Sequence, residues 1–258
     1  MSANASLLKV TGLTKSFGGV KAVDHVNFSI AQGEMLSLIG PNGAGKSTCF
    51  NMINGQLQAD GGSITLDGED ILGLPPRKIW RRGVGRTFQI AATFASLTVA
   101  ENIQMALLSH AGKIFHWFKP AARFYRAEAL ALLERVGMAA QADRPCSDLA
   151  YGDVKRVELA IALASKPKLL LMDEPTAGMA PAERIALIAL IKRLVTEDGL
   201  AMLFTEHSMD VVFSYSDRVI VLARGNLIAE GGVEAIRDND KVKSVYFGSG
   251  KTFEKETA

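Results

Sequence analysis

A glycine-rich segment between an apolar run and a helical pattern carries the residue types that hold phosphate groups. It consists of Gly40, Pro41, Asn42, Gly43, Ala44, Gly45, Lys46, Ser47 and Thr48. The run before it, Met35–Ile39, is typical of a buried strand, and Lys46–Leu57 has the pattern of a helix. Glycines let successive backbone N–H groups turn toward phosphate oxygens, and the start of the helix adds positive potential. The spacing predicts a P-loop, in which Lys46 reaches the β- and γ-phosphates and the Ser47 hydroxyl binds Mg²⁺.

Two acidic residues, Asp173 and Glu174, follow the continuous apolar run Leu169–Met172. Such a run is typical of a central strand buried on both faces, and ligands bind at the carboxyl ends of strands in open α/β sheets. We expect Asp173 to hold Mg²⁺ through its shell and Glu174 to orient or deprotonate the attacking water. A chance glycine-rich turn and an N-cap after Pro175 are the alternatives for the two motifs taken singly. Together they predict a nucleoside triphosphatase.

The strands that must position these residues can be predicted from the alternation of apolar runs and helical patterns along the chain. Short β-branched or apolar runs alternate with helical patterns, which predicts an α/β fold with a mostly parallel sheet flanked by helices. The first few and the last two strands are expected to be antiparallel, because Asp67-Gly68 and Arg224-Gly225-Asn226 have hairpin turn chemistry. The expected strands are Leu7–Val10, Val26–Ile30, Met35–Ile39, Ile64–Leu66, Val84–Phe88, Leu169–Met172, Ala201–Phe204, Arg218–Leu222 and Leu227–Glu230.

Strand signals are missing between Phe94 and Leu149, where helical spacing takes over in Val99–Leu108 and Arg126–Val136. This predicts a helical subdomain at residues 93–164, inserted into an α/β core made of residues 1–92 and 165–250. The whole forms a single domain over residues 1–250. A polar tail, residues 251–258, follows it.

Composition excludes several classes of function. The chain of 258 residues has a formal charge of +2 and 7% aromatic residues, so neither a basic stripe nor a set of stacking platforms for nucleic acid is expected. Cys49 and Cys146 lack metal-ligand spacing and fit small apolar fillers in a reducing compartment. No signal peptide and no apolar run of about 20 residues is found, so any membrane role is expected to come through a partner.

Three weaker features lie around the two strong motifs. Gln89 follows the strand Val84–Phe88, Leu149–Arg156 opens a helix before the acidic strand, and His207 lies just beyond Ala201–Phe204. Alone, each is more typical of a surface or capping residue than of a site. Their order and spacing around the P-loop and the acidic pair favour a functional role.

This pattern resembles the ATP-binding cassette ATPases from residue 7 to about residue 247. The resemblance implies a RecA-like P-loop NTPase core with an N-terminal antiparallel β part. It also implies that Gln89 contacts Mg²⁺ and lies against a membrane permease, and that His207 contacts the γ-phosphate. Phe17 would stack on adenine, although a core residue of an edge strand remains the alternative for this ring.

Leu149–Arg156 corresponds to the signature segment of that family. There, Leu149, Ala150, Tyr151, Gly152 and Asp153 would contact the γ-phosphate bound to the P-loop of a second subunit. A helix N-terminus with Gly152 can offer backbone donors and positive potential to that anion. The resemblance therefore implies sites built from two chains and obligatory pairing for turnover.

Two positions depart from the family pattern. Ala150 stands where most relatives have Ser, which removes one hydrogen bond to a charged group, worth roughly 1.5–3 kcal/mol. Ala180 stands where an Asp usually crosses the dimer interface. Both departures suit a chain that meets a different partner.

Several stretches are similar to the Liv-type ATPases of branched-chain amino-acid import, in particular the G-type subunit. They are Arg81–Gln89, Leu149–Gly152, Asp173–Gly178 followed by Pro181, Glu206–Asp210 and Val245–Gly248. The resemblance implies ATP and Mg²⁺ as cofactors and a peripheral place on the cytoplasmic face of the bacterial inner membrane. Implied partners are a second ATPase (an F-type relative, or the same chain in isolation), two permeases and, indirectly, a periplasmic solute-binding protein.

Some alternatives stay open at this stage. No residue of such a subunit contacts the cargo, so branched-chain or other hydrophobic amino acids are implied by the resemblance alone. A related exporter ATPase of the lipopolysaccharide type and a non-transport cassette protein are the other functions considered. The aromatic stretch Ile114–Phe118, within the extra residues around Lys113–Arg126, can meet a permease helix or the lipid boundary, or pack within the helical subdomain.

Overall fold

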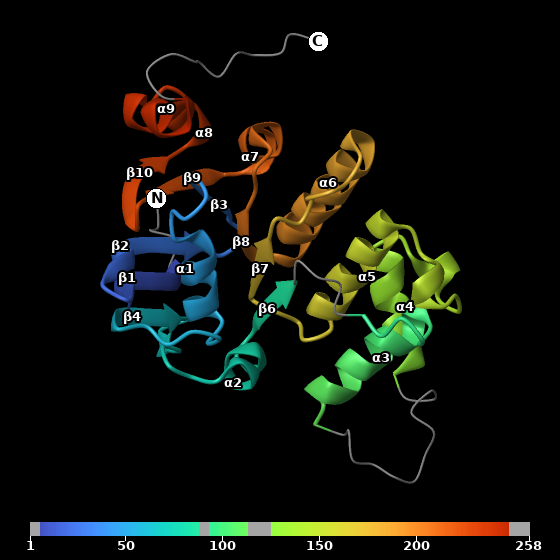
Figure 1. Ribbon diagram of the computed structural model, residues 1–258. Helices are drawn as coiled ribbons and strands as arrows, with labels where there is room; N and C mark the ends of the chain where they lie inside the picture. The colour runs from blue at the N-terminus through green and yellow to red at the C-terminus, as the bar shows by residue number, and fades with distance from the viewer. Residues whose placement is uncertain (1–5, 88–92, 113–124, 248–258) are drawn as a thin grey trace.

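The computed structural model describes residues 6–87, 93–112 and 125–247, and they form an α/β fold. An antiparallel sheet has the strand order β2-β1-β4-β5, and a mostly parallel sheet has the order β10-β9-β3-β8-β7-β6 (Figure 1). The strands of the first sheet are β1 (Ser6–Phe17), β2 (Val20–Ala31), β4 (Gly61–Leu66) and β5 (Glu69–Asp70). Those of the second are β3 (Met35–Ile39), β6 (Val84–Thr87), β7 (Leu169–Asp173), β8 (Ala201–Thr205), β9 (Arg218–Ala223) and β10 (Asn226–Gly231).

The predicted fold class is confirmed, including which neighbouring strands run parallel and which run antiparallel. The strands β6, β7, β8, β3 and β9 run parallel, whereas β10 returns antiparallel to β9. The turn before β10 has Arg224 and Gly225 at positive φ, as its hairpin chemistry predicts. The two-residue strand β5 was not predicted, because Glu69 and Asp70 carry no apolar pattern.

Helices connect the strands and cover the sheets. They are α1 (Lys46–Ile53), α2 (Pro76–Arg81), α3 (Val99–His110), α4 (Arg126–Arg135), α5 (Tyr151–Leu163), α6 (Pro181–Asp198), α7 (Met209–Tyr215), α8 (Val233–Arg237) and α9 (Asp240–Phe247). The predicted helix Lys46–Leu57 was too long. It ends at Ile53, because Gly55 takes a positive φ of 76° and the Leu57 N–H turns back to the Asn51 carbonyl oxygen at 2.9 Å.

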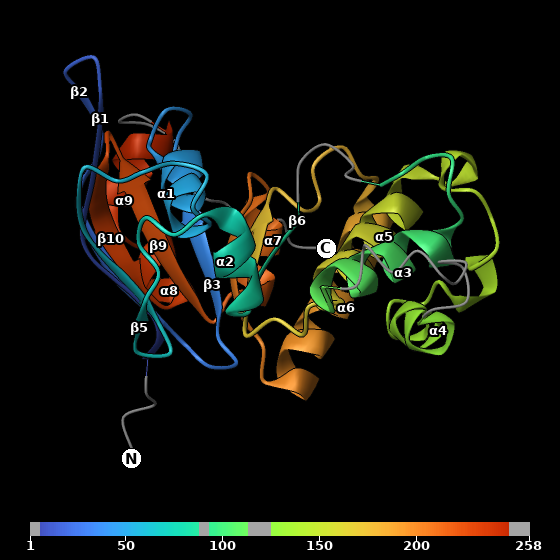
Figure 2. The same ribbon diagram turned by 90° about the horizontal axis from the view of Figure 1, so that it is seen from below.

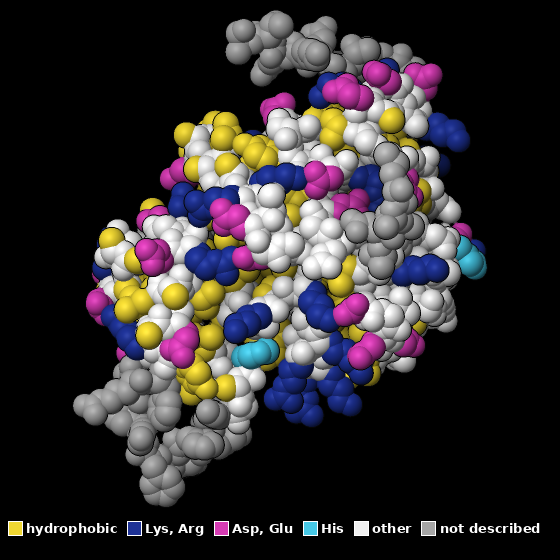
Figure 3. Space-filling model, turned by 180° about the vertical axis from the view of Figure 1, so that it is seen from behind, with side chains coloured by type: hydrophobic (Ala, Val, Ile, Leu, Met, Phe, Trp, Pro, Cys, Tyr) yellow, Lys and Arg dark blue, Asp and Glu magenta, His cyan; other side chains and the backbone are white. Residues whose placement is uncertain are grey.

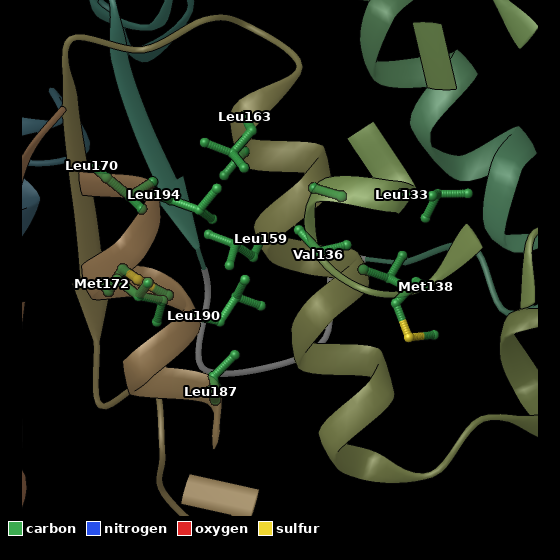
Figure 4. Packing of buried hydrophobic residues seen from close by; sticks show 14 of the residues in the cluster. Leu133, Val136, Met138, Leu159, Leu163, Leu170, Met172, Leu187, Leu190 and Leu194 are labelled. Atoms are coloured by element: carbon green, nitrogen blue, oxygen red, sulfur yellow. The ribbon is translucent and has the colours of Figure 1, made fainter. Parts of the chain in front are cut away.

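The helices α3, α4 and α5 lie together beside the parallel sheet, with α6 between them and β7 (Figures 1 and 2). Leu159 and Leu163 of α5 point toward Leu187, Leu190 and Leu194 of α6 (Figure 4). The same cluster includes Leu170 and Met172 of β7, so these helices and one face of the sheet share a core. Figure 4 shows Leu133, Val136 and Met138 on the other side of α5. The division into two subdomains remains a prediction.

The helices α3 and α5 begin in opposite ways. At α3, the Thr98 hydroxyl accepts a hydrogen bond from the Glu101 N–H at 3.2 Å, and the Glu101 carboxylate accepts one from the Thr98 N–H at 2.8 Å. This is a complete capping box. At α5 the N-cap is Ala150, and at α6 it is Ala180, so no side chain caps either helix. In the first turn of α5 the Asp153 N–H donates to the Ala150 carbonyl oxygen at 3.0 Å, so the N–H groups before it are the ones that need other acceptors.

The surface of the described residues carries mixed charge. Figure 3 shows Lys and Arg side chains interspersed with Asp and Glu across one face of the molecule. None of the described helices is both long enough and apolar enough to span a bilayer. Cys49 and Cys146 are buried free thiols, and burial raises the pKa of Cys49 to about 12.

Candidate functional site

Residues 40–48 connect β3 to α1 in a conformation that requires glycine at two places. Gly40 has a φ of 155°, and Gly45, the N-cap of α1, has a φ of 107°. A Cβ on Gly40 would lie 2.2 Å from the carbonyl oxygen of Leu222, and one on Gly45 would lie 2.3 Å from that of Ala22. The loop is thus packed directly on the backbones of β9 and β2. No side chain caps α1, so its first-turn N–H groups are left to bind an anion.

The Lys46 side chain is buried within this loop. Its ammonium group donates hydrogen bonds to the carbonyl oxygens of Gly40 at 2.7 Å and Pro41 at 3.1 Å. Burial lowers the pKa of Lys46, while the nearby negative charges of Glu174 and Asp173 act in the opposite direction. The fold therefore brings the lysine of the loop to the predicted acidic pair, although they lie far apart in sequence.

The rest of the loop faces outward. Asn42, Gly43 and Ser47 are exposed, whereas Ala44 is buried. Ser47 lies in the first turn of α1, so its exposed side chain stands at the N-terminus of this helix. That arrangement suits a chain of phosphates lying across the helix N-terminus.

The acidic pair is held by the end of the neighbouring strand. Asp173 pairs in register with Thr205, whose hydroxyl donates to Asp173 Oδ1 at 2.6 Å. The Glu174 N–H donates to both the carbonyl and the hydroxyl oxygen of Thr205, each at 3.1 Å. These bonds hold Glu174 at a φ of 50°, a left-handed conformation of the kind that costs about 1–3 kcal/mol in a residue other than glycine. Strain of this size at a predicted catalytic residue supports its assignment to a site.

His207 lies beside this carboxylate. Its Nε2 is 2.8 Å from Glu174 Oε1, and the imidazole is about half exposed. The structure thus brings these two predicted site residues together, and their roles in hydrolysis stay predictions. We call the residues gathered here, 40–48, 173–176 and 205–207, the phosphate edge, because they follow the carboxyl ends of the adjacent strands β3, β7 and β8.

Arg86 was not predicted as a site residue, yet it reaches the phosphate edge from β6. Its Nη2 lies 3.8 Å from Asp173 Oδ2, and its Nη1 donates to Asn51 Oδ1 at 2.9 Å and to Gln56 Oε1 at 3.0 Å. Burial lowers the pKa of Arg86, and the charge of Asp173 opposes that shift. Only the pairing of β6 with β7 reveals this contact, because no local pattern around Arg86 points to it.

Arg86 also lines a cavity of about 340 Å³ among α2, α3 and α5. Ile79 and Trp80 of α2, Ala106 of α3 and Ile161 of α5 contribute apolar surface to it. The cavity lies next to β6, the strand that precedes Gln89. Gln89 itself and the stretch at residues 114–118 lie outside the described residues, so their expected contacts stay predictions.

Phe17 ends β1 with 49% of its surface exposed. The Lys15 ammonium lies 5.5 Å from the centre of its ring. The alternative of a buried edge-strand residue is therefore wrong, and stacking on adenine remains a prediction that an exposed ring permits.

The start of α5 lies apart from the P-loop of the same chain, as both ribbon views show (Figures 1 and 2). Tyr151 is 48% exposed, and Gly152 packs against the beginning of α6. A Cβ on Gly152 would lie 3.4 Å from Met179 Cε and 3.5 Å from the Glu183 carboxylate. The chain thus does not bring residues 149–153 to its own phosphate edge. Their expected contact with a second subunit stays a prediction.

Comparison with known proteins gives the site a context. A family model described as "ABC transporter" matches residues 23–177. The chain is 43% identical to the high-affinity branched-chain amino acid transport ATP-binding protein BraF of Pseudomonas aeruginosa, over 94% of this chain and 98% of that protein. It is 41% identical, with the same coverage, to the protein LivG of Escherichia coli, which carries the same description.

A solved structure is similar over nearly the whole fold. It is the ADP conformation of an ATP-binding cassette of an ABC transporter, with a TM-score of 0.84 and 31% sequence identity. The match covers 94% of this chain and 99% of the other. The family resemblance and the fold expected from the sequence are both confirmed by these comparisons.

Proposed function

We propose that this chain, which belongs to the ABC transporter family as one of its ATP-binding ATPases, powers the import of branched-chain amino acids across a bacterial inner membrane. The observation that carries the proposal for the chemistry is the meeting of Lys46, Asp173, Glu174 and His207 at one edge of the sheet. The cargo is proposed from the printed descriptions of BraF and LivG alone.

In the proposed reaction, each residue of the phosphate edge has one task. The loop N–H groups and Lys46 bind the β- and γ-phosphates, which places the γ-phosphorus near Glu174. The Glu174 carboxylate accepts a proton from the attacking water or orients it, and its left-handed backbone fixes the direction of that carboxylate. His207, at 2.8 Å from Glu174, donates toward the γ-phosphate oxygens. Phe17 stacks on the adenine.

The donor set fits Mg²⁺ rather than a metal held by the protein alone. Ser47 and Asp173 offer a hydroxyl and a carboxylate, with Gln89 as a further proposed ligand, and oxygen donors of this kind suit Mg²⁺. Among the described residues, no group of three or more His, Cys, Asp and Glu is placed to hold a metal. That agrees with an ion bound mainly through substrate phosphates and water. When bound, the ion neutralises charge that develops on the phosphates.

We propose that the complete site needs a second ATPase subunit. The start of α5 has no capping side chain, carries an exposed Tyr151 and lies away from the P-loop of its own chain. Residues 149–153 would offer first-turn N–H groups to the γ-phosphate on the other subunit. An F-type relative or a second copy of this chain can supply that partner.

The remaining partners follow from the transport role. Two integral-membrane permeases would dock on the cytoplasmic side, and a periplasmic solute-binding protein would deliver cargo to them. The cavity beside Arg86, which is lined by apolar side chains and by Arg77 and Arg86, is the proposed contact for a permease segment. No nucleic acid partner is proposed.

An uptake assay tests the function directly. In bacteria that lack this chain, uptake of labelled leucine, isoleucine and valine should fall, while uptake of labelled lysine stays unchanged. Wild-type protein should restore uptake, and Lys46→Ala should not, because the phosphates lose their cation. Recovery of this chain with two permeases from detergent-solubilised membranes would support the assembly. Unchanged uptake, together with recovery on ribosomes or without any permease, would refute the transport role.

A further inference from the structure

The carboxylate of Glu206 is buried immediately before His207, and it connects two loops of the phosphate edge. Only 4% of the residue is exposed. Its Oε1 accepts hydrogen bonds from the Thr176 N–H at 2.9 Å and from the Thr176 hydroxyl at 2.6 Å. Its Oε2 accepts one from the His207 N–H at 3.2 Å. Among the described ion pairs none includes Glu206, so these three donors are what stabilise the carboxylate.

The position of Thr176 shows which part of the phosphate edge these bonds hold in place. Thr176 stands two residues after Glu174, and the short turn between them is closed by the Ala177 N–H, which donates to the Glu174 carbonyl oxygen at 3.1 Å. A bond at Thr176 therefore fixes the far side of the turn that carries Glu174. Thr205 fixes its near side through the Glu174 N–H. Each of the three consecutive residues 205–207 thus contacts the segment 173–176.

A second side chain joins the same two loops from the other direction. The Arg184 guanidinium donates to the Ser208 hydroxyl at 3.0 Å and to the Met179 carbonyl oxygen at 3.4 Å. Ser208 follows His207, and Met179 belongs to the loop that ends at α6. Glu206 and Arg184 therefore each bridge the loop after β7 to the loop after β8, Glu206 near the carboxylates and Arg184 farther along.

We propose that Glu206 is a positioning residue, which locks the turn carrying Glu174 to His207 so that the carboxylate and the imidazole keep one relative geometry during hydrolysis. The inference rests on the proposed roles of Glu174 and His207. Burying a carboxylate without a cation is costly, and a neutral residue would fill the same space at lower cost. Its three bonds all go to backbone or hydroxyl groups of the two loops, which is what alignment of the loops requires.

The test compares steady-state ATP hydrolysis by the full chain with Glu206→Gln. We expect kcat to fall roughly tenfold or more, because an amide cannot accept all three hydrogen bonds, while KM for ATP and the dissociation constant of a fluorescent ATP analogue change little. Asp210→Asn is the matched control. It removes an exposed carboxylate four residues away that makes no described ion pair, and its kcat should equal that of the wild type.

The partner residue gives an independent arm, which also serves if Glu206→Gln does not fold. Thr176→Val removes the hydroxyl that donates to Glu206, and it should lower kcat, whereas Thr176→Ser should keep most of it. Combining Glu206→Gln with His207→Ala separates the two possible roles. A positioning residue adds little once the imidazole is gone, whereas a general packing defect lowers kcat by its full factor again.

Two outcomes overturn the inference. One is a kcat for Glu206→Gln within twofold of the wild type, and the other is full additivity with His207→Ala. Failure of what the inference rests on looks different. If the proposed roles of Glu174 and His207 fail, Glu174→Gln and His207→Ala hydrolyse ATP at the wild-type rate, and if the transport role fails, amino-acid uptake is unchanged while the kcat ratios above stay as they are.

Discussion

The phosphate edge and the start of α5 are built on opposite plans. At the phosphate edge, the carboxylates of Asp173, Glu174 and Glu206 all have hydrogen-bond partners from the same chain, which are Thr205, His207 and Thr176 in that order. At the start of α5, Ala150 leaves the helix without a capping side chain, although α3 in the same group of helices has a complete capping box. A side chain caps α3, whereas no side chain caps α5.

The difference separates what the chain completes alone from what it leaves to a partner. A capping side chain at α5 would satisfy a first-turn N–H from within the chain. With Ala150 in that position no side chain caps the helix, although the Asp153 N–H donates to the Ala150 carbonyl oxygen at 3.0 Å. The N–H groups of Tyr151 and Gly152 are then the donors that an anion on a partner can meet. Changes at the phosphate edge should therefore abolish chemistry in each chain, whereas changes at α5 should act on the neighbouring chain.

The largest expected effect comes from the phosphate edge. Glu174→Gln removes the proposed base but keeps the size of the side chain, so turnover should fall about 10²–10⁴-fold while ATP still binds. Single-turnover hydrolysis and nucleotide-binding measurements check both parts. Near-normal hydrolysis by this variant would show that the water is activated by another group.

A smaller effect is expected at Gly152. A Cβ there meets only ordinary contacts within the chain, at 3.4 Å from Met179 Cε, so Gly152→Ala should fold normally. It should still lower turnover about tenfold, because a methyl group disturbs hydrogen bonds between the helix start and a phosphate. Mixing it with Lys46→Ala sharpens the comparison. If the site spans two copies of this chain, the mixture should exceed the sum of the separate activities, whereas simple addition would favour a self-sufficient chain or a different partner.

Removing the cap of α3 should affect folding alone. Thr98→Ala takes away one half of the capping box, so the free energy of unfolding should fall by about 1 kcal/mol. Denaturant titration measures it, and ATP hydrolysis per folded molecule should stay unchanged. A loss of turnover at the same folded fraction would contradict the separation between structural and functional helix ends.

The smallest effect is expected from adding a cap where none exists. Ala150→Ser should raise the free energy of unfolding by up to about 1 kcal/mol, since serine can accept from the first turn of α5. Ala180→Ser, at the uncapped start of α6, is the matched control for stability. Equal stability gains with an unequal change in turnover would locate the phosphate contact at α5, and identical behaviour of the two variants would argue against it.

Local patterns were sufficient to predict the strands of the parallel sheet and the P-loop, but the predicted Leu7–Val10 and Val26–Ile30 are only parts of the longer strands β1 and β2. Apolar runs such as Met35–Ile39 and the spacing of Gly40, Gly45 and Lys46 lie within one stretch of chain, so they predict their own structure. The acidic pair was predicted for the same reason, because Asp173 is the last residue of β7 and Glu174 directly follows it. The predicted helix Lys46–Leu57 is longer than α1, because the turn at Gly55 depends on contacts that hydrophobic periodicity does not describe.

The residues that hold the site in place could not be predicted from local patterns. Thr205 and Glu206 contact residues 173–176 across a sequence distance of about 30 residues, through the register of β7 with β8. Arg86 reaches Asp173 through the register of β6 with β7. A single sequence fixes no register between parallel strands, and the residue types Thr, Glu and Arg are common on surfaces.

The position of β3 at the middle of the sheet also sets a schedule for making the protein. Its neighbours are β8 and β9, which begin at Ala201 and Arg218, so the strand that leads into the P-loop leaves the ribosome long before its neighbours exist. At synthesis rates of about 5–20 residues per second, the gap from Ile39 to Ala223 lasts roughly 10–40 s. During that interval β3, whose residues are apolar except for Ser37, has no sheet to join, and the nascent chain depends on protection from aggregation. The ATP site is thus among the last parts of the molecule to come into being, although its best-known motif is among the first to be synthesised.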